Sequence, residues 1–199
     1  MRRAWSKEVS GQMDRVVLDT DFITGILEYG DGDALDLFRR VFRALGCIPV
    51  VHSFVADHEL ALNQKAQILL NEGTLQRIQL DTLDVPEEED GKVLYRNNFS
   101  DMYRQITFET LLEDTDIFAR NAGKSFGEIH SILLATEQGI PLLCSNDGDA
   151  RIAAGYYARG RLTVENAKEV AEQLNGSSLI MPKERKFIGN YYKRRQRGN

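Results

Sequence analysis

Short apolar runs alternate with amphipathic segments along most of the 199-residue chain. Runs of a few apolar residues bounded by turn residues predict strands, whereas apolar residues spaced three and four apart predict helices that cover a core. The predicted strands lie at 16–18, 48–51, 75–80, 140–144 and 162–164. The predicted helices lie at 34–45, 92–121, 147–158 and 167–174, with others beginning at Phe22, at Ser125 and at Ser53, the last extending toward Gly73.

This order of elements predicts an α/β fold with three layers, in which helices cover both faces of a central, mainly parallel sheet. In such sheets the functional crevice lies at the carboxyl ends of the strands, where the strand order reverses. Asp19 and Asp21 follow the first predicted strand, and Asp147 and Asp149 follow the strand at 140–144. We therefore look for chemistry at this edge of the sheet.

Composition and charge divide the chain into an acidic body and short extensions. With 42% hydrophobic and 28% charged residues, the sequence is typical of a globular protein. We expect an N-terminal extension at 1–14, one domain at 15–176 with a loop and helical insertion at about 81–121, and a basic tail at 177–199. The segment 81–90 has six acids in ten positions, so we expect it to loop into solvent.

The basic tail has seven lysine and arginine residues against one glutamate, while the whole chain has a net charge of −5. The remaining body is therefore strongly acidic, which does not suit a domain that grips nucleic acid over its whole face. The tail is either a solvated end of the chain or a local patch that meets phosphate or an acidic surface.

The cysteines, the lengths of the apolar stretches and the start of the chain indicate where the protein is expected to reside. Cys47 and Cys144 lie in apolar runs, so we expect buried, reduced thiols rather than a disulfide. No apolar stretch approaches the roughly 18 residues that a membrane span needs. No hydrophobic segment follows the basic start of the chain, so we expect no secretory leader and a cytoplasmic protein.

The candidate site consists of acidic residues at four places in the chain, with two more acids beside them: Asp19, Glu59, Glu128 and Asp147, and then Asp21 and Asp149. Each has a structural alternative. The aspartates would cap the helices that follow them, and Ser125 with Glu128 has the spacing of a capping box. Glu59 would be a solvated residue on the flank of a helix.

The acids are more informative together than singly. Carboxylates gathered at strand ends repel one another unless protons or a cation neutralise them. Oxygen ligands suit a hard ion such as Mg²⁺ or Mn²⁺ rather than zinc. His52, His58 and His130 lack the spacing of a zinc site, and we interpret them as satisfied structural side chains. Divalent ions held by acids activate water and stabilise charge on a phosphate oxygen, so phosphodiester cleavage is the favoured reaction.

Four segments resemble the motifs of the PIN-domain nucleases, in the same order along the chain. The segment at 16–23 is similar to the first strand and acid, and the segment at 53–60 to a helix that carries a glutamate. The segment at 127–135 resembles an acid that opens a helix of small residues, and the segment at 145–151 resembles the last acidic motif. The resemblance covers about residues 15–175.

The resemblance implies a metal-dependent ribonuclease with a three-layer α/β/α domain. Its metal ligands would be Asp19, Glu59, Glu128 and Asp147, with Asp149 as a fifth candidate, and the metal would be Mg²⁺ or Mn²⁺. RNA is the implied substrate, and many small members are toxins held by an antitoxin protein, so an antitoxin is an implied partner. A second copy of the chain is a further candidate partner. Ser145 would bond a ligand carboxylate or water, and Lys124 and Arg151 would meet the substrate phosphate.

The chain also departs from the pattern of the family. Asn146 stands before Asp147 where many members have two adjacent acids, which leaves the last ligand open. The chain exceeds compact toxin domains by some fifty residues, and the excess lies at about 81–121 and in the basic tail.

Two other functions are compatible with the residues. In a haloacid-dehalogenase-like phosphatase, Asp19 would be the nucleophile, Asp21 the acid, and Asp147 or Asp149 a magnesium ligand, but the expected lysine motif is not evident. Alternatively, a PIN-like fold without turnover would bind protein or RNA, with the acids serving as helix caps.

Overall fold

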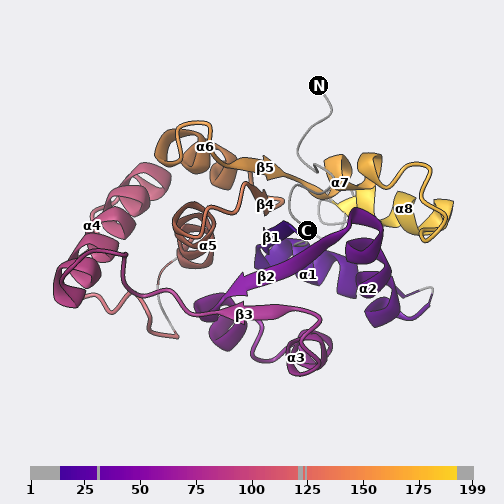
Figure 1. Ribbon diagram of the computed structural model, residues 1–199, viewed down its shortest axis with the longest axis horizontal. Helices are drawn as coiled ribbons and strands as arrows, with labels where there is room; N and C mark the ends of the chain where they lie inside the picture. Colours follow the sequence, from indigo (N-terminus) through magenta and orange to yellow (C-terminus); the bar gives the residue numbers. More distant parts are fainter. Residues whose placement is uncertain (1–13, 31, 121–122, 124, 192–199) are drawn as a thin grey trace.

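A computed structural model describes residues 14–30, 32–120, 123 and 125–191 of the chain. Figure 1 shows a central sheet with helices on both sides. The strands are β1 (Asp14–Leu18), β2 (Cys47–His52), β3 (Gln76–Ile78), β4 (Leu142–Cys144) and β5 (Thr163–Glu165). All neighbouring strands are parallel and their order is β3-β2-β1-β4-β5. The predicted α/β fold with three layers is confirmed.

The helices cover the two faces of this sheet. They are α1 (Thr20–Leu27), α2 (Ala34–Leu45), the π-helical turn η1 (Val55–Glu59), α3 (Gln64–Asn71), α4 (Glu88–Thr107), α5 (Phe126–Glu137), α6 (Gly148–Tyr157), α7 (Ala167–Gln173) and α8 (Pro182–Gly189). One core lies between the sheet and α1, α2, α3, α7 and α8. The other lies between the sheet and α5, with α4 and α6 packed around α5.

Strand side chains alternate between these two cores, as the pleat of a strand requires. Val16 and Leu18 of β1 point into the core under α1 and α2, and Val17 between them points into the core under α5. Leu143 faces α5, and Cys144 beside it faces the other core. Because both faces are buried, the strands read as continuous apolar runs.

The segment predicted as one helix from Ser53 toward Gly73 is two elements. Leu60 N–H donates to the carbonyl of Val55, five residues back, which makes η1 a π-helical turn. The chain then turns, and the side chain of Asn63 accepts from Ala66 N–H at the start of α3. Asn63 is therefore the helix start that interrupts the predicted continuous helix.

The helix predicted at 92–121 is α4, which begins four residues earlier and ends at Thr107. Glu88, Glu89 and Asp90 lie in its first turn, where acids favour a helix N-terminus, so the predicted acidic loop is partly helical. The helix ends at Phe108 in the left-handed conformation, with φ of 60°. Arg96 then donates to the carbonyls of Leu112, Glu113 and Thr115, which folds the following segment back along α4.

Part of the basic C-terminal segment packs into the body of the protein. Arg40 of α2 donates to both carboxylate oxygens of Glu184 in α8 and to the carbonyl of Leu179. Tyr191 is 5% exposed, and its ring lies against Gly25 of α1, where a Cβ would come within 2.6 Å of it. The residues from 192 onward lie outside the described part of the chain.

The two cysteines are buried and free, as the sequence predicts. None of the helices that the structure describes has the length and apolar character to cross a membrane.

Candidate active site

The carboxyl ends of β1 and β4 are adjacent, and they form the point at which the strand order reverses. After β1, the chain adds β2 and β3 on one side of it and then β4 and β5 on the other. Asp19 N–H donates to the carbonyl of Cys144 at 3.0 Å, so the residues that follow the two strands lie side by side. The first and last acidic motifs therefore meet at the place where parallel sheets bind ligands.

Asp19 is held in one orientation by hydrogen bonds to both of its carboxylate oxygens. Its Oδ1 accepts from Thr20 N–H at 2.8 Å, which makes Asp19 the cap of α1, and its Oδ2 accepts from Ser145 Oγ–H at 2.9 Å. The side chain is buried, with 5% of the residue exposed. Burial, followed by the negative charge of Glu59, raises the pKa of Asp19 to about 7.

Ser145 links the two strand ends. Its hydroxyl donates to Asp19 and accepts from Asp147 N–H at 3.1 Å, and the residue is 1% exposed. Asp147 caps α6, because its Oδ1 accepts from Asp149 N–H at 2.8 Å. Asp19 and Asp147 therefore cap helices and also belong to the acidic cluster. The capping hydrogen bonds fix the positions of their carboxylates.

Glu59 is the last residue of the π-helical turn η1, and its carboxylate contacts α1 and the start of α5. Thr20 Oγ–H donates to its Oε2, and Gly127 donates a backbone hydrogen bond to its carboxylate. A Cβ on Gly127 would lie 2.3 Å from Glu59 Oε1, so only glycine leaves room for the carboxylate here. Desolvation of this carboxylate and the charge of Asp21 raise the pKa of Glu59.

Glu128 lies in the first turn of α5, but it does not belong to a capping box. Ser125 has a left-handed φ of 67° and caps no backbone N–H of α5, so this structural alternative is wrong for Ser125 and Glu128. The carboxyl group of Glu128 is instead hydrogen-bonded to that of Asp147. Burial, the charge of Asp19 and this contact with Asp147 raise the pKa of Glu128 to about 9.

The remaining predicted site residues lie in different situations. The carboxylate of Asp149 is exposed at the start of α6, beside the cluster. Arg151 donates to the carbonyl of Val164 and to the carboxylate of Glu169, so its guanidinium is engaged on the β5 and α7 side. Lys124, the other predicted phosphate contact, lies outside the described residues.

Asn146 occupies a structural position. Its Oδ1 accepts from Ala167 N–H at 2.9 Å, and the residue is 4% exposed. The side chain therefore turns toward α7, whereas the neighbouring Ser145 and Asp147 turn toward Asp19 and Glu128. Asp147 is the residue of this motif that contacts the cluster.

The carboxylate oxygens of this cluster are donors of the kind that a hard divalent cation prefers. No group of three or more acidic, histidine or cysteine side chains in 14–30, 32–120, 123 and 125–191 forms a ready-made metal site. Glu128 Oε2, however, is buried without a hydrogen-bond partner, which is costly for a carboxylate oxygen. Two carboxyl groups can share a hydrogen bond only when one of them holds a proton. A hard cation would replace that proton and supply the missing partner of Glu128.

The sequence patterns did not single out Thr20 and Gly127 as site residues. Thr20 follows the first acid directly and positions Glu59 from a distant part of the chain. Gly127 precedes Glu128 and leaves the space that the Glu59 carboxylate occupies. An available signal was their position beside the two acids, since a residue next to a ligand often orients another ligand.

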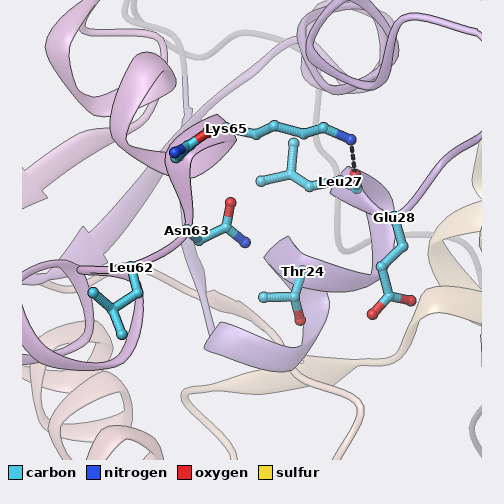
Figure 2. Close-up of a pocket in the computed structure, with 7 residues that line it drawn as sticks. Thr24, Leu27, Glu28, Leu62, Asn63 and Lys65 are labelled. Carbon is cyan, nitrogen blue, oxygen red and sulfur yellow. Dashed lines mark hydrogen bonds between the residues drawn. The ribbon is translucent and has the colours of Figure 1, made fainter.

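A hollow of about 520 Å³ lies between the end of α1 and the start of α3, and Figure 2 shows its lining. Lys65 lies along one side of it and donates to the carbonyl of Leu27, and Leu62 and Glu28 also line it. None of the clustered acids lines it. The hollow is therefore separate from the candidate active site.

His52 and His130 are packed in the core, as the interpretation of structural side chains expects. Their rings stack at 4.6 Å in the core beneath α4. Tyr95 O–H bonds His130 Nδ1 at 2.6 Å, and the carbonyls of Ile117 and Leu80 accept from the two imidazoles. Burial lowers the pKa of His52 to about 4 and of His130 to about 3, so both are neutral structural groups.

The fold and the cluster define an α/β protein with linked carboxyl groups at the switch point of a parallel sheet. Comparison of the chain with protein-family models, with curated proteins and with solved structures finds no match.

Proposed function

We propose that the protein is a metal-dependent ribonuclease that hydrolyses RNA phosphodiester bonds at the cluster of Asp19, Glu59, Glu128 and Asp147. The observation that carries the proposal is the unpartnered, buried Oε2 of Glu128. Around it, the charge of Glu59 raises the pKa of Asp19, and Asp19 and Asp147 raise the pKa of Glu128. A folded protein tolerates such a set of carboxyl groups poorly unless a cation or protons neutralise it, and functional sites are where such sets occur.

The chain's own residues preorganise the carboxylates for this role. Ser145 fixes Asp19 against the start of α6, Thr20 fixes Glu59, and the cap bond to Asp149 N–H fixes Asp147. Mg²⁺ or Mn²⁺ bound here would activate water and stabilise the charge that develops on the phosphate oxygens. In this hydrolysis water would add to phosphorus, the bond to the leaving ribose oxygen would break, and that oxygen would take up the proton that the water loses. The acids would hold the metal rather than act as nucleophiles.

The choice of RNA follows from the resemblance of the four motifs to PIN-domain nucleases. The same resemblance supports an antitoxin protein as a partner. A second copy of the chain is a further candidate partner. Asp149, exposed beside Asp147, is the additional candidate ligand.

The test uses Asp19→Asn and Asp147→Asn with single-stranded RNA of mixed sequence, in Mn²⁺ and in EDTA. Both variants should lose cleavage while their circular dichroism stays that of the native protein. Asp101→Asn is the matched control, because Asp101 is an exposed acid on α4 whose loose ion pair with Arg104 is 3.6 Å long. Retained cleavage in both site variants would show that the assigned roles are wrong.

The inert binding module is the second candidate, and the lack of a ready-made metal site among the described residues favours it. Thermal melts with increasing Mn²⁺ separate the two functions, because a cation that binds the folded state raises its melting temperature by mass action. No Mn²⁺ response, together with no cleavage, would favour the inert module. A phosphoaspartate at Asp19 would instead indicate the phosphatase.

A further inference from the structure

The outward face of α6 presents two large apolar side chains to solvent. Ile152 is 72% exposed and Tyr156 is 69% exposed, and they lie four residues apart on one side of the helix. The opposite side is buried through Ala150, Ala153 and Ala154. The exposed face of an amphipathic helix is ordinarily polar, so this apolar pair needs another explanation than packing.

The pair continues directly from the candidate active site. Asp147 caps α6, and Asp149 in its first turn precedes Ile152 by three residues and Tyr156 by seven. At the rise of an α-helix these side chains follow the acids at roughly 5 and 10 Å along the axis. A strand bound with one phosphate at the carboxylates would therefore pass its next bases over Ile152 and Tyr156.

The helix surface beside Ile152 and Tyr156 is exposed, and positively charged residues follow the end of α6. A Cβ on Gly155, which lies between them in the sequence, would meet nothing within 4 Å, so none of the described elements covers the helix at this position. Arg159 and Arg161 follow the end of α6 and are exposed. Along α6, the carboxylates at its start are thus followed by the exposed apolar pair and then by the two guanidinium groups.

This arrangement suits a single nucleic acid strand better than a protein partner. Aromatic side chains stack on bases without regard to sequence, and arginines pair with the phosphates between them. A stable protein interface buries about 1,000 Å² or more, which two side chains flanked by a glycine and charges do not supply.

We propose that Ile152 and Tyr156 form a stacking platform for the bases next to the phosphodiester that the protein cleaves, with Arg159 and Arg161 contacting the strand beyond. This inference rests on the proposed ribonuclease function and adds how the single-stranded substrate is held.

The experiment measures the binding of a short, fluorescein-labelled single-stranded RNA by anisotropy in EDTA, where a metal-dependent enzyme does not turn over. Tyr156→Ala should weaken binding at least about fivefold, as loss of one base stack predicts. Tyr156→Phe should bind like the native protein, because the ring remains. Phe108→Ala is the control, since Phe108 is an aromatic residue that is 91% exposed at the end of α4 rather than on α6.

Cleavage kinetics in Mn²⁺ give the second readout. Tyr156→Ala and Ile152→Ala should raise KM for a longer RNA with little change in kcat. Both effects should be smaller with a dinucleotide, because its one base beyond the cleaved bond covers only the near part of the platform. A structural role for Tyr156 would instead lower stability and alter both substrates equally.

The outcomes separate this inference from the proposed function. RNA binding that depends on Tyr156 without any cleavage would sustain the platform and overturn the ribonuclease. Cleavage that is indifferent to Tyr156→Ala would overturn the platform alone. An absence of RNA binding, or a Tyr156→Ala variant whose only change is from dimer to monomer in light scattering, would also overturn the platform, the latter in favour of a protein interface.

Discussion

Replacing Glu128 by glutamine should stabilise the metal-free protein at alkaline pH. The folded state keeps a proton on Glu128 that the unfolded chain releases, because the pKa of this group rises from 4.5 to about 9. Stability is therefore lost as the pH rises toward the folded-state pKa. Glutamine mimics the protonated acid, because its amide N–H can donate to Asp147 as a protonated carboxyl group does.

The size of the effect follows from the linkage relation. Between about pH 7 and about pH 8.5, the ideal loss is about 2 kcal/mol, at 1.36 kcal/mol per unit of pH. Partial exposure of Glu128 reduces this to about 1–2 kcal/mol, or about 3–6 °C in melting temperature for a chain of this size. In this window the buried His52 and His130 are neutral in the folded state.

The assay is a series of thermal melts in EDTA and in Mn²⁺ across that window. The native protein should melt lower at the alkaline end in EDTA, and Mn²⁺ should remove the loss. Glu128→Gln should show little pH dependence and little response to Mn²⁺. Glu137→Gln, an exposed glutamate at the other end of α5, is the control and should behave like the native protein. A native protein equally stable at both pH values in EDTA would refute the reasoning.

Three further predictions test other parts of the structure. Gly127→Ala should weaken Mn²⁺ binding about tenfold in calorimetry without unfolding the protein, because its Cβ displaces the flexible Glu59 carboxylate; unchanged affinity would exclude Glu59 as a ligand. Arg40→Met should cost about 3 kcal/mol in urea denaturation, since it leaves the carboxylate of Glu184 buried and unpaired; a loss below about 1 kcal/mol would contradict this account. Tyr95→Phe should cost about 1–3 kcal/mol by removing the hydroxyl partner of His130, and RNA cleavage should persist; lost cleavage in a folded variant would connect the histidine cluster to the reaction.

The fold was predictable because its signals are local and repeated. The apolar spacing of α2 ends at Gly46, which has a left-handed φ of 70°, and the predicted bounds 34–45 agree with the structure. The acids after β1 and β4 could be expected at one edge because parallel strands end on the same side. The order of the strands then brought Asp19 and Asp147 together.

The predictions that were wrong or incomplete depend mostly on contacts between distant parts of the chain. The end of α4 is a phenylalanine in a conformation that favours glycine, and Arg96 holds the chain beyond it, so no local signal stops the predicted helix at Thr107. Asn63 was a readable cap that the apolar pattern around it obscured. At the site, Thr20 and Gly127 act on Glu59 from distant parts of the chain, and a linear pattern cannot show that contact.

The packing of α8 determines where the protein can be shortened. A version that stops at Gly176 would leave Arg40 without Glu184 and would uncover the surface of α1 around Gly25 that Tyr191 now shields. Such a truncation would expose apolar surface and invite aggregation during expression. Recombinant forms intended for crystals or binding studies should therefore retain the chain through Tyr191.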